Sequence, residues 1–279
     1  MRWLMAALGA TALTGCAPEG TKAPTPPDTQ ALRDTFTAPS GRLTAQSAQA
    51  VVSTLEARLQ EVADVASLLT LGTGAVGALT GTVAVEHGLR AADGEAASSA
   101  GWALESRHDG LTVGVEAGGW VVLERRCPGW GDPDERGQIA LTAVASSASG
   151  FADTLWGAAR GCRAIRGADG ARLRYDADIR LVVPDFERPS ELMLQIAGAV
   201  TVDGATREYD FRARFAEGRA FLSQRLDEGQ SLLLGLDFEK LGQAQTLEDL
   251  LDGLEVVDAQ GTWTCDLQGC TGPGGEIAW

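Results

Sequence analysis

The chain has 279 residues, 22% of them charged, and a formal net charge of −15. This length is enough for one large hydrophobic core or two small ones. A strongly acidic surface repels nucleic acid and anionic lipid headgroups, so the charge argues against nucleic-acid binding and against direct adsorption to a membrane.

The first sixteen residues have the pattern of an export signal. Arg2 precedes an apolar run from Trp3 to Leu13, and small residues then lead to Cys16. The run is shorter than the ~20 residues that a membrane-spanning helix needs. We therefore expect residues 1–15 to be a signal peptide, with an ordinary secretory signal cut elsewhere as the alternative.

The end of this signal, Leu13–Cys16 with the sequence LTGC, resembles the lipobox of bacterial lipoproteins. The resemblance implies that Cys16 is lipidated, for example with palmitate, and becomes the first residue of the mature protein. Several acyl chains hold a protein stably on a bilayer. Ala17 stands where enterobacterial lipoproteins of the inner membrane carry Asp, so the resemblance favours the outer membrane, facing the periplasm or the cell surface.

Residues 16–42 are rich in proline and threonine, with prolines at 18, 24, 26, 27 and 39. Such a segment has too few apolar groups to offset the entropy of ordering it, and its prolines favour an extended habit. The pattern predicts a tether. Residues 43–279 are then expected to form a single β-rich domain.

Two helices are expected in this domain. Residues 44–70 carry a stripe of apolar side chains at helical spacing, which favours packing on the rest of the domain. The stripe consists of Val51, Leu55, Leu59, Val62, Ala66 and Leu69. A short second helix is expected over 246–253, because Thr246 with Asp249 has the spacing of a capping box and Gly253 favours a helix end.

Alternating apolar and polar residues dominate from residue 79 onward. The clearest strand is 172–183, and Asp203-Gly204 between two alternating runs predicts a hairpin turn. Other strands are expected at 80–90, 98–107, 110–117, 119–126, 138–147, 219–225, 230–238 and 255–266. The fold class is α+β, mainly β: a large curved antiparallel sheet or partly closed barrel of about ten strands, packed on the N-terminal helix.

The cysteines predict two disulfides. Setting Cys16 aside for lipid leaves Cys127, Cys162, Cys265 and Cys270, and an exported chain meets an oxidising compartment. Three connectivities are possible. Pairing of neighbours along the chain favours Cys127–Cys162 and Cys265–Cys270.

Motifs of known chemistry are few. The chain has no GxSxG, HExxH or phosphate-binding loop, the cysteine spacings are not those of a zinc site, and neither a metal nor another cofactor is expected. The loop 127–136 offers Asp132, Asp134 and Glu135 as calcium ligands, but an acidic turn under Trp130 is the favoured interpretation.

Three functions remain from the sequence. The favoured one is a non-enzymatic β-rich binding or structural module, held on the bilayer through Cys16, with an unknown protein or hydrophobic ligand as partner. The second is a carrier of a hydrophobic ligand in a cavity between sheet and helix, as in lipoprotein carriers of the Lol type, whose order of elements looks similar. The third is a hydrolase that uses Asp176 and Asp178, although Arg174 and Arg180 beside them favour a surface charge ladder.

Overall fold

The structure is a computed structural model of the whole chain. It describes residues 24–55, 57, 58, 60–62, 64, 102–108, 111–116, 120–127, 130–132, 136–144, 153–165, 170–184, 190–226, 230–237, 239, 240 and 247–279. The expected signal peptide, Cys16 and the expected strand over 80–90 lie outside these residues.

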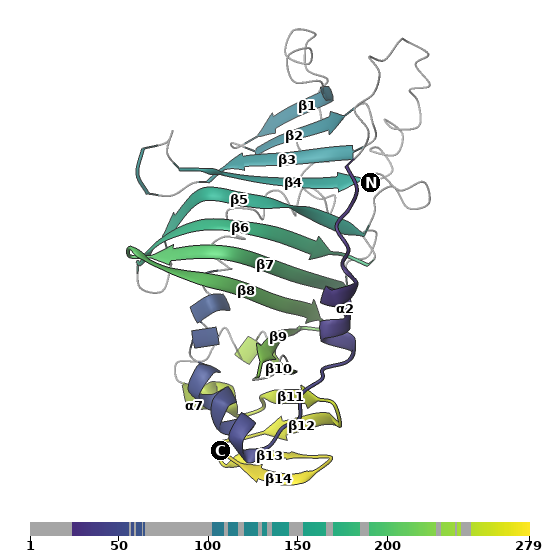
Figure 1. The fold of residues 1–279 in the computed structure, drawn as a ribbon, viewed down its shortest axis with the longest axis vertical. Helices are drawn as coiled ribbons and strands as arrows, with labels where there is room; N and C mark the ends of the chain where they lie inside the picture. The colour runs from purple at the N-terminus through teal and green to yellow at the C-terminus, as the bar shows by residue number, and fades with distance from the viewer. Residues whose placement is uncertain are drawn as a thin grey trace. The chain divides into compact units, whose positions relative to one another are not determined.

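Strands make up most of the described chain, and hydrogen-bonded neighbours follow chain order from β1 to β14 (Figure 1). They are β1 (Trp102–His108), β2 (Leu111–Glu116), β3 (Trp120–Arg126), β4 (Gln138–Val144), β5 (Thr154–Ile165), β6 (Arg172–Val182), β7 (Glu191–Val202), β8 (Ala205–Ala216), β9 (Arg219–Arg225), β10 (Ser231–Asp237), β11 (Glu255–Asp258), β12 (Gly261–Cys265), β13 (Gly269–Gly272) and β14 (Gly275–Ala278).

The expected antiparallel sheet is confirmed. Every pairing whose register the structure describes is antiparallel. Among the described strands none joins β1 to β14, so the sheet is open. Within the described residues the sheet has 14 strands, where about ten were expected of the whole chain.

Strand β5 was not predicted, because its sequence does not alternate. Gly157, Gly161 and several alanines dilute the pattern, and the register with β6 shifts between Ala159 and Cys162. Gly161 lies in this irregularity with a φ of 60°. A bulge inserts one extra residue, so the side chains after it switch to the opposite face of the sheet. The alternation of apolar and polar residues is then interrupted in the sequence.

The C-terminal strands form short hairpins. The expected strand over 255–266 is divided into β11 and β12 by a turn at residues 259–260. The buried Asp258 side chain satisfies this turn, because its Oδ1 accepts the backbone N–H groups of Gln260 at 2.7 Å and Gly261 at 3.0 Å. The two central residues, Ala259 and Gln260, are neither Gly, Pro nor Asn, so the turn signal between the two strands is weak.

Helix α2 (Gln30–Thr37) lies where the tether was expected. Leu32 and Phe36, four residues apart, are both buried, and the Thr35 hydroxyl accepts a hydrogen bond from Arg212 Nη1 at 3.0 Å. Two apolar residues on one helical face anchor this segment, so the ordered chain begins before residue 43.

The helix expected over 44–70 is present at residues 45–55, with further helical residues up to 64; residues 65–70 lie outside the described chain. A capping box starts it, because the Thr44 backbone N–H donates to Ser47 Oγ at 2.8 Å and the Ser47 N–H donates to Thr44 Oγ1 at 3.2 Å. Its apolar stripe is buried at Val51 and Leu55. The expected second helix is α7 (Leu247–Leu251).

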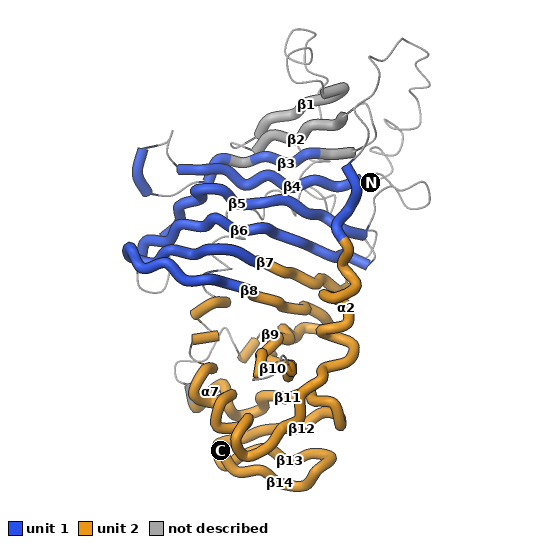
Figure 2. The backbone as a smooth tube through the Cα atoms, in the orientation of Figure 1, with its two compact units in different colours: residues 1–27, 64–189, 197–209 blue, residues 28–63, 190–196, 210–279 orange. Residues whose placement is uncertain are grey.

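Two compact units divide the described chain, and β7 and β8 contribute to both (Figure 2). Unit 1 comprises residues 1–27, 64–189 and 197–209. Its core is the face of β6 that carries Leu173, Tyr175 and Leu181. The Tyr175 hydroxyl donates to the backbone carbonyl of Asp64 at 2.6 Å, and the buried Asp64 carboxylate accepts from Arg207 Nη2 at 2.8 Å. The bond from Arg207 gives a partner to a carboxylate that has no access to water.

Unit 2 comprises residues 28–63, 190–196 and 210–279. Its core is filled by aliphatic and aromatic side chains of α2, the 45–55 helix and strands β8 to β13. The helix also reaches β9 through a polar contact, since Arg58 Nε donates to the buried Gln224 Oε1 at 2.9 Å. Among the residues that the structure describes, no helix has both the length and the apolar character to cross a bilayer.

The Asp210 carboxylate on β8 is the centre of a hydrogen-bonded cluster in unit 2. Gln195 Nε2 donates to its Oδ1 at 3.0 Å and Arg212 Nε at 3.1 Å, and Arg225 pairs with Oδ2. Burial raises the pKa of this carboxyl. The hydrogen bonds from Gln195 and Arg212 and the charges of Arg212 and Arg225 outweigh burial and hold the pKa below its ordinary value.

Asp210→Asn is expected to lower the free energy of unfolding at neutral pH by about 1–3 kcal/mol, because hydrogen bonds to a charged group contribute about that much. A depressed folded-state pKa stabilises the fold above the unfolded value of about 3.9, and this contribution is lost as pH falls through the folded pKa. Urea unfolding at neutral pH and at successively lower pH values measures the difference. We expect it to shrink in acid.

The matched control is Asp252→Asn, whose side chain is 71% exposed and lies 3.7 Å from Lys240 Nζ. An exposed pair contributes roughly 0–1 kcal/mol, so this variant should stay close to the wild type. A gap between wild type and Asp210→Asn that keeps its size down to the lowest pH would contradict the assigned role of the Asp210 charge.

Candidate functional site

A loop between β3 and β4 is closed by a backbone hydrogen bond between its ends and is joined to strand β5 by a disulfide and a second backbone hydrogen bond. The disulfide joins Cys127, at the start of the loop, to Cys162 on β5, with their Cα atoms 5.4 Å apart. The Cys127 N–H donates to the Gly137 carbonyl and the Arg163 N–H to the Arg136 carbonyl, both at 3.1 Å. The loop is therefore held against the C-terminal part of β5, at Cys162 and Arg163.

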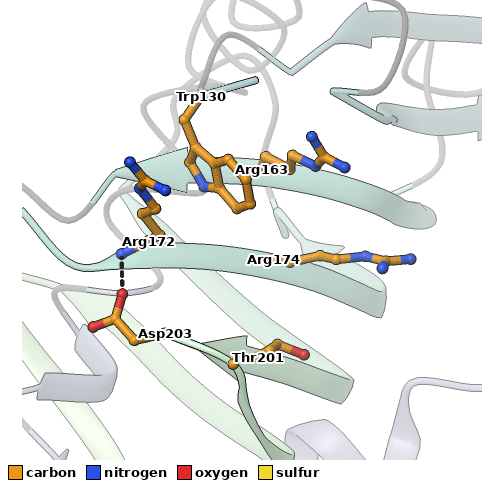
Figure 3. Close-up of a pocket in the computed structure, with 7 residues that line it drawn as sticks. Trp130, Arg163, Arg172, Arg174, Thr201 and Asp203 are labelled. Carbon is orange, nitrogen blue, oxygen red and sulfur yellow. Dashed lines mark hydrogen bonds between the residues drawn. The ribbon is translucent and has the colours of Figure 1, made fainter. Parts of the chain in front are cut away.

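The loop carries Trp130, whose ring lies between two guanidinium groups (Figure 3). Arg163 on β5 and Arg172 on β6 have their guanidinium carbons 4.7 Å and 5.3 Å from the ring centroid. The indole Nε1–H donates to the Leu173 carbonyl at 3.4 Å, which ties the ring to β6. A cation–π contact of this kind holds a guanidinium group over the ring. The N–H groups at the edge of the guanidinium remain able to donate hydrogen bonds to other groups.

The turn between β7 and β8 is clamped to the start of β6. Asp203 and Gly204 both have positive φ, 46° and 92°, which suits the expected Asp-Gly hairpin turn. The Arg172 N–H donates to Asp203 Oδ1 and the Asp203 N–H donates to the Arg172 carbonyl, both at 3.0 Å. The predicted turn is confirmed, and it lies beside Arg172.

These elements line a pocket of about 410 Å³ within unit 1 that is open to solvent. Its lining residues are Trp130, Arg163, Arg172, Arg174, Thr201, Asp203 and Gly204. The volume lies in the range of sites for small ligands, roughly 300–1,000 Å³. Three arginines and one aspartate are among these described lining residues, which therefore carry an excess of positive charge and of hydrogen-bond donors.

The strand register explains why the arginines meet. Arg163 lies directly opposite Arg174 in the β5–β6 pair, and Arg172 lies opposite the exposed Ile165. Directly opposite residues share one face of a sheet, and like charges in that position are destabilising. Further along the two strands, opposite charges meet instead in the ion pair of Arg160 with Asp178.

Both disulfides favoured by the sequence are present. Besides Cys127–Cys162, the structure joins Cys265 to Cys270, which lie opposite each other in the β12–β13 pair with Cα atoms 4.0 Å apart. The first positions the pocket loop, and the second closes a hairpin in unit 2.

The structure places the suggested catalytic carboxylates in ion pairs. Asp176 Oδ2 lies 3.3 Å from Arg174 Nε, and its Oδ1 accepts the Gly161 N–H at 2.8 Å. Asp178 pairs with Arg160, and both of these side chains are more than half exposed. This arrangement is the surface charge ladder that the alternating signs indicated.

The suggested calcium loop is described only in part. Asp132 is within the described residues, whereas Asp134 and Glu135 are not. No three His, Cys, Asp or Glu residues of the described chain lie close enough together to hold a metal ion.

The pocket arginines were not singled out by the sequence. Arg174 was expected in a surface charge ladder on the strand over 172–183, and it is exposed on β6; Trp130 was expected in a turn. Their meeting with Arg163 depends on β5 and its bulge, which the pattern did not reveal.

Comparisons with known proteins add no relative of the chain. No family model, no curated protein and no solved structure matches it. The roles of the pocket residues therefore follow from their own geometry.

Proposed function

We propose that this protein is a bacterial lipoprotein, anchored through acylated Cys16, whose folded part is a non-enzymatic β-rich binding or structural module. The observation that carries the proposal is the position of Cys16 at the end of a short apolar signal with small residues before it. An export signal of this kind is removed, which leaves the cysteine at the mature N-terminus.

The cysteine pairing supports this proposal. The sequence contains five cysteines, and the two disulfides take four of them. Cys16 remains as the one that neither disulfide uses. Stable disulfides are typical of exported proteins, because cytosolic thiols are kept reduced.

The outer membrane is the proposed location, facing the periplasm or the cell surface. Ala17 in place of Asp favours it by the lipoprotein resemblance. Residues 24–29 form neither helix nor strand, which is compatible with a short spacer before α2. The acidic chain itself would be repelled by anionic headgroups, so the acyl chains would provide the attachment.

Two other functions stay predictions without a specific observation in their favour. A carrier of hydrophobic ligands needs an apolar cavity between sheet and helix, whereas the pocket described above lies on the polar face and is lined by arginines. A hydrolase using Asp176 and Asp178 would need carboxylates that are not already neutralised by arginine.

Cys16→Ser is expected to abolish lipidation, because serine has no thiol to form the thioether. Cells fed labelled palmitate and then fractionated give the measurement. The wild type should carry label and sediment with membranes, and the variant should carry none and leave the membrane fraction.

The matched control is Thr21→Ser, a similarly small change in the proposed tether, which should keep both the label and the membrane association. If Cys16→Ser is labelled and fractionates like the wild type, the lipoprotein assignment is wrong.

A further inference from the structure

We propose that the pocket between Trp130 and strands β5 to β7 binds the oxyanion group of a small ligand, a phosphate or a carboxylate. This inference concerns the folded part alone and does not depend on the lipid anchor. It extends the proposed binding module by naming a site and a ligand class.

The first argument is the charge that the pocket concentrates. Three arginines and one aspartate line it, in a protein whose formal net charge is −15. Asp203 Oδ1 already accepts a hydrogen bond from the Arg172 backbone N–H, and Arg174 already forms an ion pair with Asp176. Among the residues that the structure describes, no carboxylate pairs with the Arg172 guanidinium. A bound anion would supply that missing partner.

The second argument is the cross-strand pair of Arg163 and Arg174. Like charges directly opposite each other weaken a sheet, whereas Arg160 and Asp178, further along the same two strands, have opposite signs and form an ion pair. A local rule that is broken is typical of a functional site. An anion bound between the two side chains would relieve the repulsion.

The third argument is that the donors are held in place before any ligand arrives. The Trp130 ring lies between the guanidinium groups of Arg163 and Arg172, and its own N–H is bonded to β6. The disulfide at Cys127 holds the loop that carries the ring. Ordering arginine side chains in advance lowers the entropic cost of binding. The planar fork of a stacked guanidinium matches two oxygens of a phosphate or carboxylate.

The surroundings favour a small ligand over a polymer. A long polyanion such as nucleic acid would extend beyond the pocket and meet the repulsion of the acidic surface. A single oxyanion group meets only the local excess of arginine, and the 410 Å³ volume suits a small molecule.

The test is calorimetric titration of the full chain, purified in neutral detergent, with inorganic pyrophosphate and separately with citrate. We expect saturable binding of at least one probe, weakening as salt is raised. The probe that binds more tightly identifies the preferred oxyanion, phosphate or carboxylate. Absence of saturable binding by both would overturn the proposal.

Variants of β6 provide the specificity control. Arg172→Gln is expected to weaken binding by roughly 10-fold or more, since a hydrogen-bonded charge is lost. Arg172→Lys should recover only part of the affinity, because lysine keeps the charge but not the fork. Arg180→Gln removes the same charge from the same strand, eight residues along and outside the pocket lining, and should bind like the wild type.

Arg172 is exposed, so its replacement should leave the thermal unfolding midpoint unchanged. If Arg172→Gln does unfold, Arg174→Gln takes its place with the same expectation. Equal weakening in the pocket variant and in Arg180→Gln would mean that the probes respond to overall charge, and the assigned site would be wrong.

Discussion

Replacing Cys127 and Cys162 together by alanine is expected to lower the free energy of unfolding by about 4 kcal/mol. The two cysteines are 35 residues apart in sequence, and a cross-link of that span removes much conformational freedom from the unfolded chain. Denaturant unfolding of the oxidised full chain and of the double variant gives the difference.

The second disulfide is the matched comparison. Cys265 and Cys270 are only 5 residues apart, so the same chain-entropy account gives about 2 kcal/mol for their removal. Equal losses for the two double variants would contradict that account. A loss near zero for the first pair would mean that the backbone hydrogen bond from Arg163 to Arg136 holds the loop on β5 without the cross-link.

The first disulfide should also matter for the pocket, whereas the second should not. Cys162 precedes Arg163 in β5, and Cys127 begins the loop that carries Trp130. Cutting this link releases the loop from the strand, so the affinity for the better of the two oxyanion probes should fall together with stability. The Cys265/Cys270 variant should lose stability and keep its affinity.

The strands that alternate were predictable, and those that do not were missed. The run from Arg172 has charged residues on one face and apolar residues on the other, and it forms β6 within one residue of the expected end. In β5 the glycines, alanines and bulge remove that signal, although its side chains are as buried as those of its neighbours. Period-based reading detects a half-solvated strand better than an irregular one.

The pocket illustrates what a sequence pattern leaves out. The Asp203-Gly204 turn and the solvated face of β6 were both foreseeable from local residues. The register between β5 and β6 decides which arginine of β5 lies opposite Arg174. That register depends on the irregularity at Gly161, which no local sequence pattern predicts. Local chemistry was therefore readable, whereas the juxtaposition of the three arginines was not.

Gly157→Ala is expected to destabilise the fold by at least ~3 kcal/mol, because β5 approaches β4 too closely for a side chain at this position. A Cβ on Gly157 would lie 1.9 Å from the Ala140 carbonyl oxygen and 2.9 Å from the Leu141 Cα. Both are backbone atoms of a strand hydrogen-bonded to β5, so neither can rotate away as a side chain would.

Gly170→Ala separates this steric effect from the general cost of replacing glycine. Gly170 has a φ of 74° and nothing within 4 Å of its added Cβ, so alanine there meets only backbone strain of about 1–2 kcal/mol. Denaturant unfolding of both variants should show the larger loss of unfolding free energy for Gly157→Ala, although the φ of Gly157 is not in the left-handed region.

The size of the Gly157 effect also tests how β4 and β5 are joined. Strand β4 follows the disulfide loop, and β5 carries Cys162 and Arg163, so a shift between the two strands would move Trp130 relative to its arginine partners. Gly157→Ala should therefore weaken oxyanion binding even in the folded fraction. A variant that keeps both wild-type stability and wild-type affinity would mean that β4 and β5 can separate at Gly157 without disturbing the loop, which the close backbone approach argues against.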